Sequence, residues 1–287
     1  MKRNDVLGEL TLADGTRFVF RVAAAAAASG PIVVIIPALG IRSRFYEGFA
    51  RRLAGQGLTA VTVDLRGQGE SGPRADRRSR HGYRELVETD LPRVIDFVRG
   101  ALAGRPLWIV GHSLGGQLSL VHAGIHAHTV SGVVLIASGS AWHGGFTGYR
   151  RPRNLVFSQL FVAVAYGLGF WPGDAFGFGG RQSRVLMRDW ARQVRTGSYA
   201  GVGSELDYEQ ALRGLTGPVL AVEIEGDTLA PAGAVTHLCD KIPNASVTRW
   251  RYTRALSGTV NLGHFAWARH SPGLAEHVTE WMREHTA

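Results

Sequence analysis

Short apolar runs alternate along the chain with longer segments in which apolar residues recur at helical spacing. Each run is continuous, which is typical of strands covered on both faces. We expect six such strands, at residues 32–36, 58–63, 106–110, 132–137, 218–224 and 245–252. Helical segments lie between or after them, at residues 45–56, 83–98, 114–128, 232–241 and 272–285. This alternation predicts an α/β fold in which helices cover both faces of a mostly parallel sheet.

The pattern departs from this alternation at two places. Near the start, residues 9–12 and 17–22 alternate and flank an Asp-Gly turn, which predicts an antiparallel hairpin and brings the sheet to eight strands. The alanine-rich residues 23–31 are interpreted as a connector. From Gly139 the chain is rich in aromatic residues, Gly and Arg, without a buried strand before residue 218. We therefore expect an α/β core in two parts with a helical cap between them, at residues 1–138, 208–287 and 139–207 respectively.

Composition limits the class of protein. The 287 residues include 45% hydrophobic and 19% charged residues, as in ordinary folded proteins. The net charge of +9 comes almost entirely from Arg, but no basic helix is interleaved with stacking aromatic residues, so no nucleic-acid partner is expected. An acidic substrate or an anionic membrane surface stays open. The single cysteine excludes an intrachain disulfide, and without a signal-peptide core the cytoplasm is the expected location.

A serine stands at the junction between a predicted strand and the helix that follows it. The segment Gly111–Gly116, G-H-S-L-G-G, contains the pattern G-x-S-x-G directly after the strand at 106–110. In a nucleophile elbow the turn is so tight that the serine has strained backbone angles and its neighbours must be small. The free N–H groups of the helix and its positive dipole end point toward the same place. Ser113 is therefore the candidate nucleophile.

A serine hydroxyl needs a base, and the base needs a partner that fixes its tautomer. Both are expected after strands, at the edge where the loops of an open α/β sheet converge. Asp227 follows the strand at 218–224 and a turn Gly; Glu223 and Glu225 compete with it, and a helix-capping role is its alternative. His264 follows the last strand. The order Ser113, Asp227, His264 is that of α/β-hydrolases.

The chain resembles the α/β-hydrolase superfamily over nearly its whole length. The resemblance rests on the elbow, on residues 64–71 (D-L-R-G-Q-G-E-S), which are similar to that family's D-x-R-G-x-G-x-S turn, on residues 226–231 and on Gly263-His264. Four further segments, at residues 37–40, 167–173, 187–192 and 262–269, are similar to those of one subgroup. On these segments the chain looks most like a bacterial group of predicted α/β hydrolases with an aromatic-rich cap. That group implies an esterase-like hydrolase without fixing a substrate.

The resemblance implies a mechanism that uses neither a metal nor an organic cofactor. Ser113 attacks a carbonyl carbon, His264 takes its proton, and Asp227 orients His264. Water then releases the acyl enzyme. The expected reaction is hydrolysis of an ester with a small or medium apolar acyl or alcohol group. The alternatives are a thioesterase or acyltransferase acting on coenzyme-A or carrier-bound acyl groups, and a catalytically idle binding protein on the same fold.

The oxyanion of such a reaction needs two backbone donors. The resemblance assigns them to the N–H groups of Leu39 and Leu114. Many superfamily members have His-Gly where this chain has Pro37-Ala38, and the Ala38 N–H is a less favoured donor than that of Leu39. Because a backbone N–H does not require a particular side chain, the departure concerns the shape of the substrate near the hole.

Residues 155–171 form the most apolar stretch of the expected cap. We interpret them as a helix over the active site, with contact with a membrane surface as the less favoured alternative and a true membrane span as the least favoured. Four aromatic side chains are expected to line the substrate pocket: Phe161, Tyr166, Phe170 and Trp171. The basic loop from Arg74 to Arg84 is interpreted as solvated surface, with a phosphate clamp for a thioester carrier as its alternative.

Overall fold

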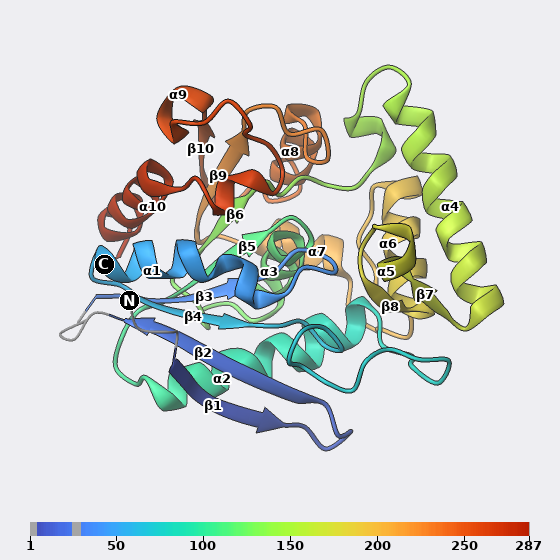
Figure 1. Cartoon of the computed structure of the whole chain (residues 1–287), viewed down its shortest axis with the longest axis horizontal. Helices are drawn as coiled ribbons and strands as arrows, with labels where there is room; N and C mark the ends of the chain where they lie inside the picture. Colours follow the sequence, from blue (N-terminus) through green and yellow to red (C-terminus); the bar gives the residue numbers. More distant parts are fainter. Residues whose placement is uncertain (1–4, 25–29, 287) are drawn as a thin grey trace.

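A sheet of eight strands forms the centre of the molecule (Figure 1). The computed structural model describes residues 5–24 and 30–286, so most of the expected connector lies outside the described residues. The strands of this sheet are β1 (Asp5–Thr11), β2 (Arg17–Ala24), β3 (Ile32–Ile36), β4 (Thr59–Val63), β5 (Leu107–His112), β6 (Gly132–Ile136), β9 (Pro218–Ile224) and β10 (Ser246–Tyr252).

The strands are ordered β1-β2-β4-β3-β5-β6-β9-β10 across the sheet. β1 and β2 form the expected antiparallel hairpin, and β2 also pairs antiparallel with β4. Every neighbouring pair from β4 to β10 is parallel. The predicted α/β fold with a mostly parallel, eight-stranded sheet is therefore confirmed. Its parallel strands end at one common edge, which is where such folds bind ligands.

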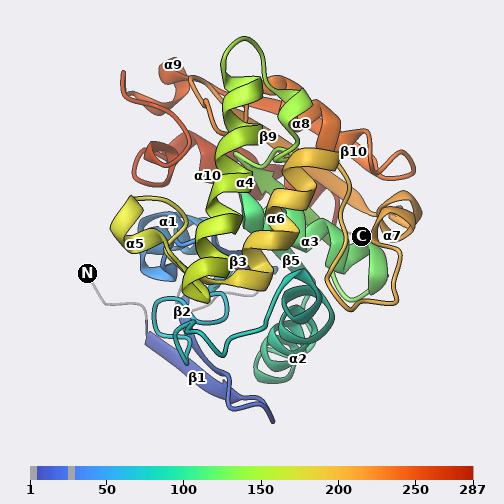
Figure 2. The ribbon, with the colours of Figure 1, turned by 90° about the vertical axis from the view of Figure 1, so that its right-hand side faces the viewer.

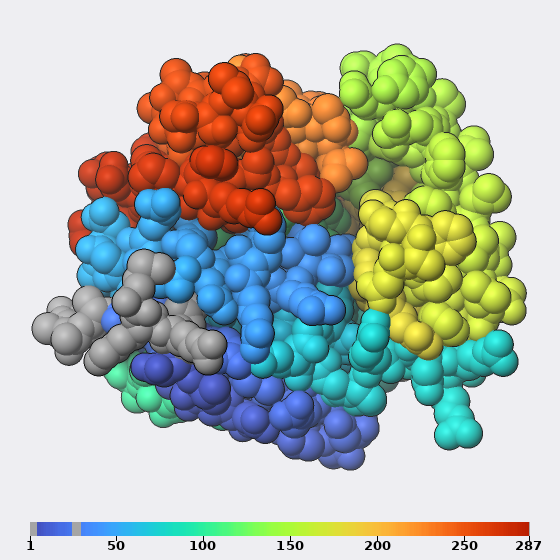
Figure 3. All heavy atoms as spheres, in the orientation of Figure 1, coloured from blue at the N-terminus to red at the C-terminus, as the bar shows by residue number. Residues whose placement is uncertain are grey.

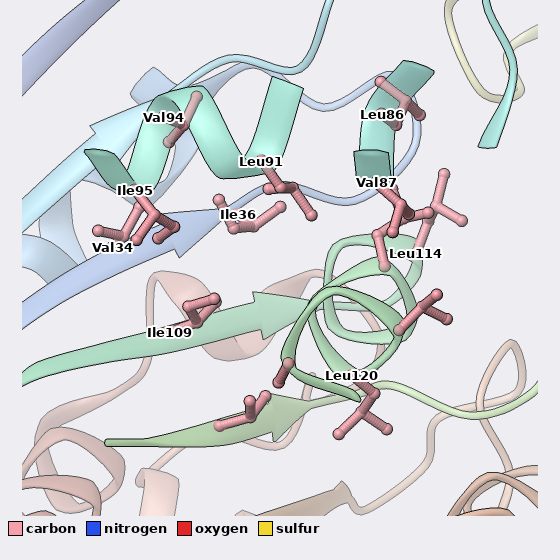
Figure 4. Close-up of a cluster of buried hydrophobic side chains, with 14 of the residues drawn as sticks. Val34, Ile36, Leu86, Val87, Leu91, Val94, Ile95, Ile109, Leu114 and Leu120 are labelled. Carbon is pink, nitrogen blue, oxygen red and sulfur yellow. The ribbon is translucent and has the colours of Figure 1, made fainter. Parts of the chain in front are cut away.

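Helices cover both faces of the sheet, because successive side chains of a strand point to opposite sides. In β3, Val34 packs in a cluster under α2, α3 and α8, whereas Val33 packs under α1 and α10. Figure 4 shows the first cluster, in which Val34 of the sheet lies beside Ile95 of α2. The helices are α1 (Glu47–Gly55), α2 (Leu91–Ala101), α3 (Leu114–Ile125), α8 (Ala232–Cys239) and α10 (Pro272–Glu284).

Between β6 and β9 the chain leaves the sheet. It forms two long helices that lie side by side at one end of the molecule (Figure 2), joined by a small two-stranded hairpin that the apolar pattern did not predict. These elements, here called the cap segment, are α4 (Arg150–Leu168), β7 (Phe170–Pro172), α5 (Gly173–Phe176), β8 (Arg181–Ser183) and α6 (Arg184–Thr196). The short helix α7 (Tyr208–Gly214) then packs on α3, and α9 (Arg254–Ser257) follows β10.

Hydrogen bonds of Asp189 and Arg181 help to fix the cap segment to the core. The buried Asp189 of α6 accepts hydrogen bonds from the backbone N–H of Tyr83 (2.8 Å) and of Val202 (3.2 Å), and its burial raises the pKa of the carboxyl to about 6. The Arg181 side chain donates from Nε to the Ala75 carbonyl at 2.6 Å. The cap segment is thus joined to the loops that follow β4.

The motif at residues 64–71 serves to hold loops together. Asp64 accepts the backbone N–H of Ser43 at 2.6 Å and that of Glu70 at 2.9 Å. The Arg66 guanidinium is buried and binds both oxygens of Asp90, with Nε to Oδ2 at 2.8 Å. Since each charge is satisfied within the core, the motif positions the loops beside the carboxyl edge of the sheet.

A buried histidine gives the fold a defined dependence on pH. His122 of α3 is fully buried, and its burial lowers the pKa of the ring to about 3. In the unfolded chain a histidine binds a proton below about pH 6.5, so this residue costs the fold about 1.4 kcal/mol for each pH unit below that value, until its folded pKa is reached. His122→Gln should therefore lose about 2 kcal/mol less stability than the wild type between pH 7 and pH 5. Urea unfolding at both pH values measures the difference.

The exposed His270 supplies the control, because His270→Gln removes a histidine without removing a buried ring. If His122→Gln and the wild type lost equal free energy of unfolding between the two pH values, a neutral, buried His122 would be excluded.

Candidate active site

Ser113 occupies a strained turn between β5 and α3. Its backbone angles are φ 52° and ψ −118°, which an L-residue adopts only under constraint. The turn is compressed because a Cβ on Gly115 would collide with the carbonyl oxygens of Ile36 and Pro37. A Cβ on Gly111 would likewise collide with the backbone of Gly116. The glycines of the pattern therefore permit the close packing that lifts Ser113 to the edge of the sheet.

Asp227 and His264 meet at the same edge, after β9 and β10. His264 Nδ1 lies 2.8 Å from Asp227 Oδ2, and both side chains are buried. The other oxygen of Asp227 accepts the backbone N–H of Leu229 (2.8 Å) and of Ala230 (2.9 Å). Three hydrogen bonds thus fix the carboxylate, which contacts the His264 imidazole and also closes its own turn.

The two glutamates that compete with Asp227 as the partner of His264 have other partners. Glu225 accepts the backbone N–H of Arg254 at 2.8 Å and pairs with its guanidinium at 3.1 Å. Glu223 pairs with the Arg249 side chain on the neighbouring strand. Both glutamates are therefore bound to arginines, whereas Asp227 is bound to His264.

One cavity of about 650 Å³ brings Ser113 and His264 together with the predicted oxyanion loop. In the described part of the chain no hydrogen bond joins the Ser113 hydroxyl to the His264 ring. Hydrogen bonds between a nucleophile and its base are often long without substrate and tighten in the complex.

The backbone donors near Ser113 can be sorted by their partners. Ala38 N–H donates to Tyr46 Oη at 3.0 Å, which removes it as an oxyanion donor. Leu114 is the first residue of α3, where a backbone N–H has no partner within the helix. The Leu39 N–H makes no hydrogen bond to any residue that the structure describes. Among the described residues, Leu39 and Leu114 thus each present an uncommitted backbone donor, and both line the cavity.

A buried network that the sequence did not reveal lies beneath the site. Tyr46 Oη accepts the Ala38 N–H and lies 2.7 Å from His112 Nδ1. Burial, reinforced by the adjacent His264, holds the pKa of His112 well below its usual range, so the ring stays neutral. The ring centroids of His112 and His264 are 4.8 Å apart. The network links the oxyanion loop, the residue before Ser113 and the His264 loop.

The walls of the cavity are largely apolar, and the expected aromatic lining is only partly found. Phe161 lines the cavity, but Tyr166, Phe170 and Trp171 are not among its walls. Tyr166 is half-exposed beneath the Arg184 guanidinium, and Phe170 stacks under Arg181. Trp171 is buried inside the cap segment, where its Nε1 donates to the Phe178 carbonyl at 2.8 Å. The aromatic side chains that line the cavity beside Phe161 are Phe146, Phe157, Phe178, Trp190 and Phe265.

Helical spacing explains the difference. Phe157 and Phe161 lie one turn apart on α4 and share the face that is turned to the cavity, a signal present in the sequence. Phe170 and Trp171 follow the left-handed Gly169, where the helix has ended and its face no longer continues. Trp190 comes from α6, and its contact with Phe161 depends on how the two helices pack.

The basic loop from Arg74 to Arg84 contacts the cap segment beside the cavity. Arg74 of the basic loop pairs with Asp174 at 2.5 Å, and Asp174 lines the cavity. Within residues 5–24 and 30–286, no three His, Cys, Asp or Glu side chains gather as metal ligands. None of the helices in these residues is long and apolar enough to cross a membrane.

A strained serine beside an Asp–His pair, at the carboxyl edge of a sheet with this strand order, defines the class of the α/β hydrolases. The chain belongs to the family described as serine aminopeptidase S33, whose model matches residues 28–190.

The individual proteins that resemble this chain share a third or less of their aligned residues with it. An uncharacterized protein of Mycobacterium tuberculosis is 32% identical over 147 residues, which are 50% of this chain and 36% of that protein. The match thus spans little more than a third of the curated relative. A carboxylesterase structure from Nitrososphaera gargenis gives a TM-score of 0.64 at 16% identity, covering 97% of this chain and 98% of that one. The thioesterase domain of the curacin biosynthetic pathway gives 0.61 at 16% identity, covering 99% and 100%. Both structures share the fold.

The network beneath the site predicts an effect on stability. Tyr46→Phe leaves the buried Ala38 N–H and His112 Nδ1 without a partner, so the free energy of unfolding should fall by about 2 kcal/mol or more. Tyr166→Phe removes a half-exposed hydroxyl of the cap segment and should change stability by less than about 0.5 kcal/mol. Urea unfolding compares the two variants. Equal, small changes would mean that Tyr46 makes no net contribution through its hydroxyl.

Proposed function

We propose that this protein is a serine hydrolase that cleaves an ester of a small or medium apolar acyl or alcohol group through an acyl enzyme. Ser113 is the nucleophile, His264 the general base and Asp227 the residue that orients His264. The observation that carries the proposal is the 2.8 Å hydrogen bond between His264 Nδ1 and Asp227 Oδ2 in the cavity that contains Ser113.

That hydrogen bond supports Nε2 as the nitrogen of His264 that acts on Ser113. A carboxylate only accepts, so Nδ1 carries the proton and Nε2 keeps its lone pair. Nε2 then takes the proton of Ser113 as the hydroxyl oxygen attacks the carbonyl carbon. The neighbouring His112 is unsuited to this role, because it is fully buried and its Nδ1 is bound to Tyr46.

The charge that develops on the substrate oxygen is stabilised by the Leu39 and Leu114 N–H groups, helped by the positive end of α3. Proton transfer from His264 to the leaving group breaks the ester bond and leaves an acyl group on Ser113. Water, deprotonated by the same ring, then attacks the acyl carbon and releases the acid. Ser113, His264, Leu39 and Leu114 all line the cavity, and Asp227 acts from behind His264.

The cavity supports an apolar substrate. Phe146, Phe157, Phe161, Phe178 and Trp190 contribute to walls in which the few polar side chains are mostly bound already. Gln117, for example, donates to the Gly139 carbonyl and accepts from Tyr199. With residues 139–207 acting as a cap over Ser113, such walls exclude water from the acyl group and favour hydrocarbon.

A thioesterase or acyltransferase is the second candidate. The pair of Arg74 with Asp174 brings the basic loop to the wall of the cavity, and Arg77 and Arg78 of that loop are exposed. A phosphate-bearing carrier would find its charge complement there. The fold likeness to a thioesterase domain is compatible with this reading. A catalytically idle binding protein is the third, and complete inertness toward esters and active-site probes would favour it.

The roles of the three residues are tested by replacing each separately. Ser113→Ala should abolish labelling by a fluorophosphonate probe and lower turnover of p-nitrophenyl acetate by several orders of magnitude, because the hydroxyl is the attacking atom. Asp227→Asn should lower turnover about 10³- to 10⁴-fold through the wrong tautomer of His264. Glu225→Gln is the matched control and should retain activity. Loss of activity in Glu225→Gln, with Asp227→Asn unaffected, would reassign the acid.

The substrate class is tested by a series of p-nitrophenyl esters from about two to about twelve carbons. Each methylene buried in the cavity should raise kcat/KM about fourfold until the cavity is full, since it contributes about 0.8 kcal/mol. Phe161→Ala should flatten this rise, whereas Phe176→Ala, which removes an exposed ring outside the cavity, should not. A flat series combined with high activity on coenzyme-A thioesters would replace the esterase proposal by the thioesterase one.

A further inference from the structure

The outer face of α4 is an exposed apolar surface without charge. Val156 and Leu160 are 60% and 52% exposed, and Ala163 and Gly167 continue the same line at helical spacing. No residue from 154 to 173 is charged. The opposite side of the helix is buried on the cap segment through Ser158, Phe161 and Ala165. Contiguous apolar exposure of this kind marks a surface that meets something other than water.

A row of arginines runs along the neighbouring helix. Arg184, Arg188, Arg192 and Arg195 recur at intervals of three and four residues and share one side of α6, opposite its buried residues. The last three are exposed, and none of the four pairs with a carboxylate in the part of the chain that the structure describes. Arg184 lies over the Tyr166 ring of α4, 5.7 Å from its centroid, so the row adjoins the apolar face.

The two helices form one outward surface. Figure 2 shows α4 and α6 side by side with their lengths turned to the viewer, and Figure 3 shows the α4 region at the outer edge of the molecule. We call the Val156–Leu160–Ala163–Gly167 line and the α6 arginine row together the cap surface. Apolar and basic side chains lying in parallel are typical of helices that rest in the interface of a lipid bilayer.

We infer that the cap surface docks on a membrane leaflet that contains anionic lipids. The apolar side chains of α4 enter the acyl boundary, while the arginines of α6 bind lipid phosphates. Charge complementarity selects this occupant over a second copy of the chain. α4 and α6 together contain a single carboxylate, Asp189, which is buried, so a copy would bring no acid to neutralise the arginines.

Docking would place the cavity at the lipid surface. Phe157 is 51% exposed beside the apolar line and also lines the cavity. Its neighbour Arg153 is exposed and lines the cavity as well. The mouth of the cavity therefore adjoins the cap surface, so an apolar molecule dissolved in the leaflet has a short path to the cavity. The inner face of α4 covers the cavity and its outer face binds lipid, so the two roles belong to different sides of one helix.

Vesicle flotation of the full chain tests the inference. Vesicles of phosphatidylcholine with about 30% phosphatidylglycerol should bind the protein at least about tenfold more tightly than phosphatidylcholine alone. Raising the salt concentration from about 0.05 M to about 0.5 M should weaken binding to the anionic vesicles, because exposed charges become screened.

Two matched pairs of variants separate the contributions. The triple variant Arg188→Gln, Arg192→Gln, Arg195→Gln should lose most of the preference for anionic vesicles. Its control removes the same charge from other exposed sites, as Arg52→Gln, Arg93→Gln, Arg213→Gln, and should retain the preference. Val156→Gln with Leu160→Gln should weaken binding about tenfold. Val6→Gln with Leu206→Gln, which replaces exposed apolar residues elsewhere, should not.

The inference is overturned if neither vesicle binds, if both bind equally, or if the control triple loses as much binding as the α6 triple. It is also overturned if sedimentation shows a dimer that Val156→Gln with Leu160→Gln dissociates, because a second copy then covers the face. Hydrolysis of a water-soluble ester is measured in parallel for every variant. Since none of these residues lines the cavity, that activity should stay unchanged, and failure of membrane docking leaves the proposed function untouched.

Discussion

The tight packing of β5, α3 and the loop after β3 is the constraint on which the site depends. Gly115 has no side chain, so α3 begins against the carbonyl oxygens that end β3. This approach brings the first N–H of α3 and the loop that carries Leu39 to the same cavity. The strained angles of Ser113 follow from the same compression. Backbone packing thus fixes the arrangement of Ser113 relative to the Leu39 and Leu114 N–H groups, to which the proposed function assigns the roles of nucleophile and oxyanion donors.

Much of the fold followed from the sequence because the buried strands are continuous apolar runs with clear ends. The candidate residues Ser113, Asp227 and His264 could be selected for a related reason. In a parallel sheet, residues just after strands meet at one edge, so position along the chain predicts proximity in space. This rule does not extend to the buried network beneath the site. Tyr46 precedes a helix and is separated from His112 by 66 positions. The sequence near either residue therefore does not predict the hydrogen bond between them.

The cap segment was the least predictable part for a physical reason. Its aromatic residues are numerous enough to fill several surfaces, and which of them face the cavity depends on the angle between α4 and α6. Phe161 is placed by its own helix and was predicted, whereas Trp171 is turned inward by a hairpin too short to leave a periodic signal. α4 carries apolar residues on its outer side as well as on its buried side. Hydrophobic periodicity therefore cannot distinguish its buried face from its exposed one.

The attachments of the cap segment determine how a ligand enters. Asp189 binds the backbone on two sides, Arg181 reaches the Ala75 carbonyl, and the backbone of Gly179 packs so closely on Gly40 that no side chain fits between them. A rigid-body swing of α4 and α6 would break all of these contacts together. These contacts hold the cap segment in one position against the core. Under the proposed function, substrates would then be selected by the dimensions of the cavity entrance, and turnover would not require α4 and α6 to swing away from the core.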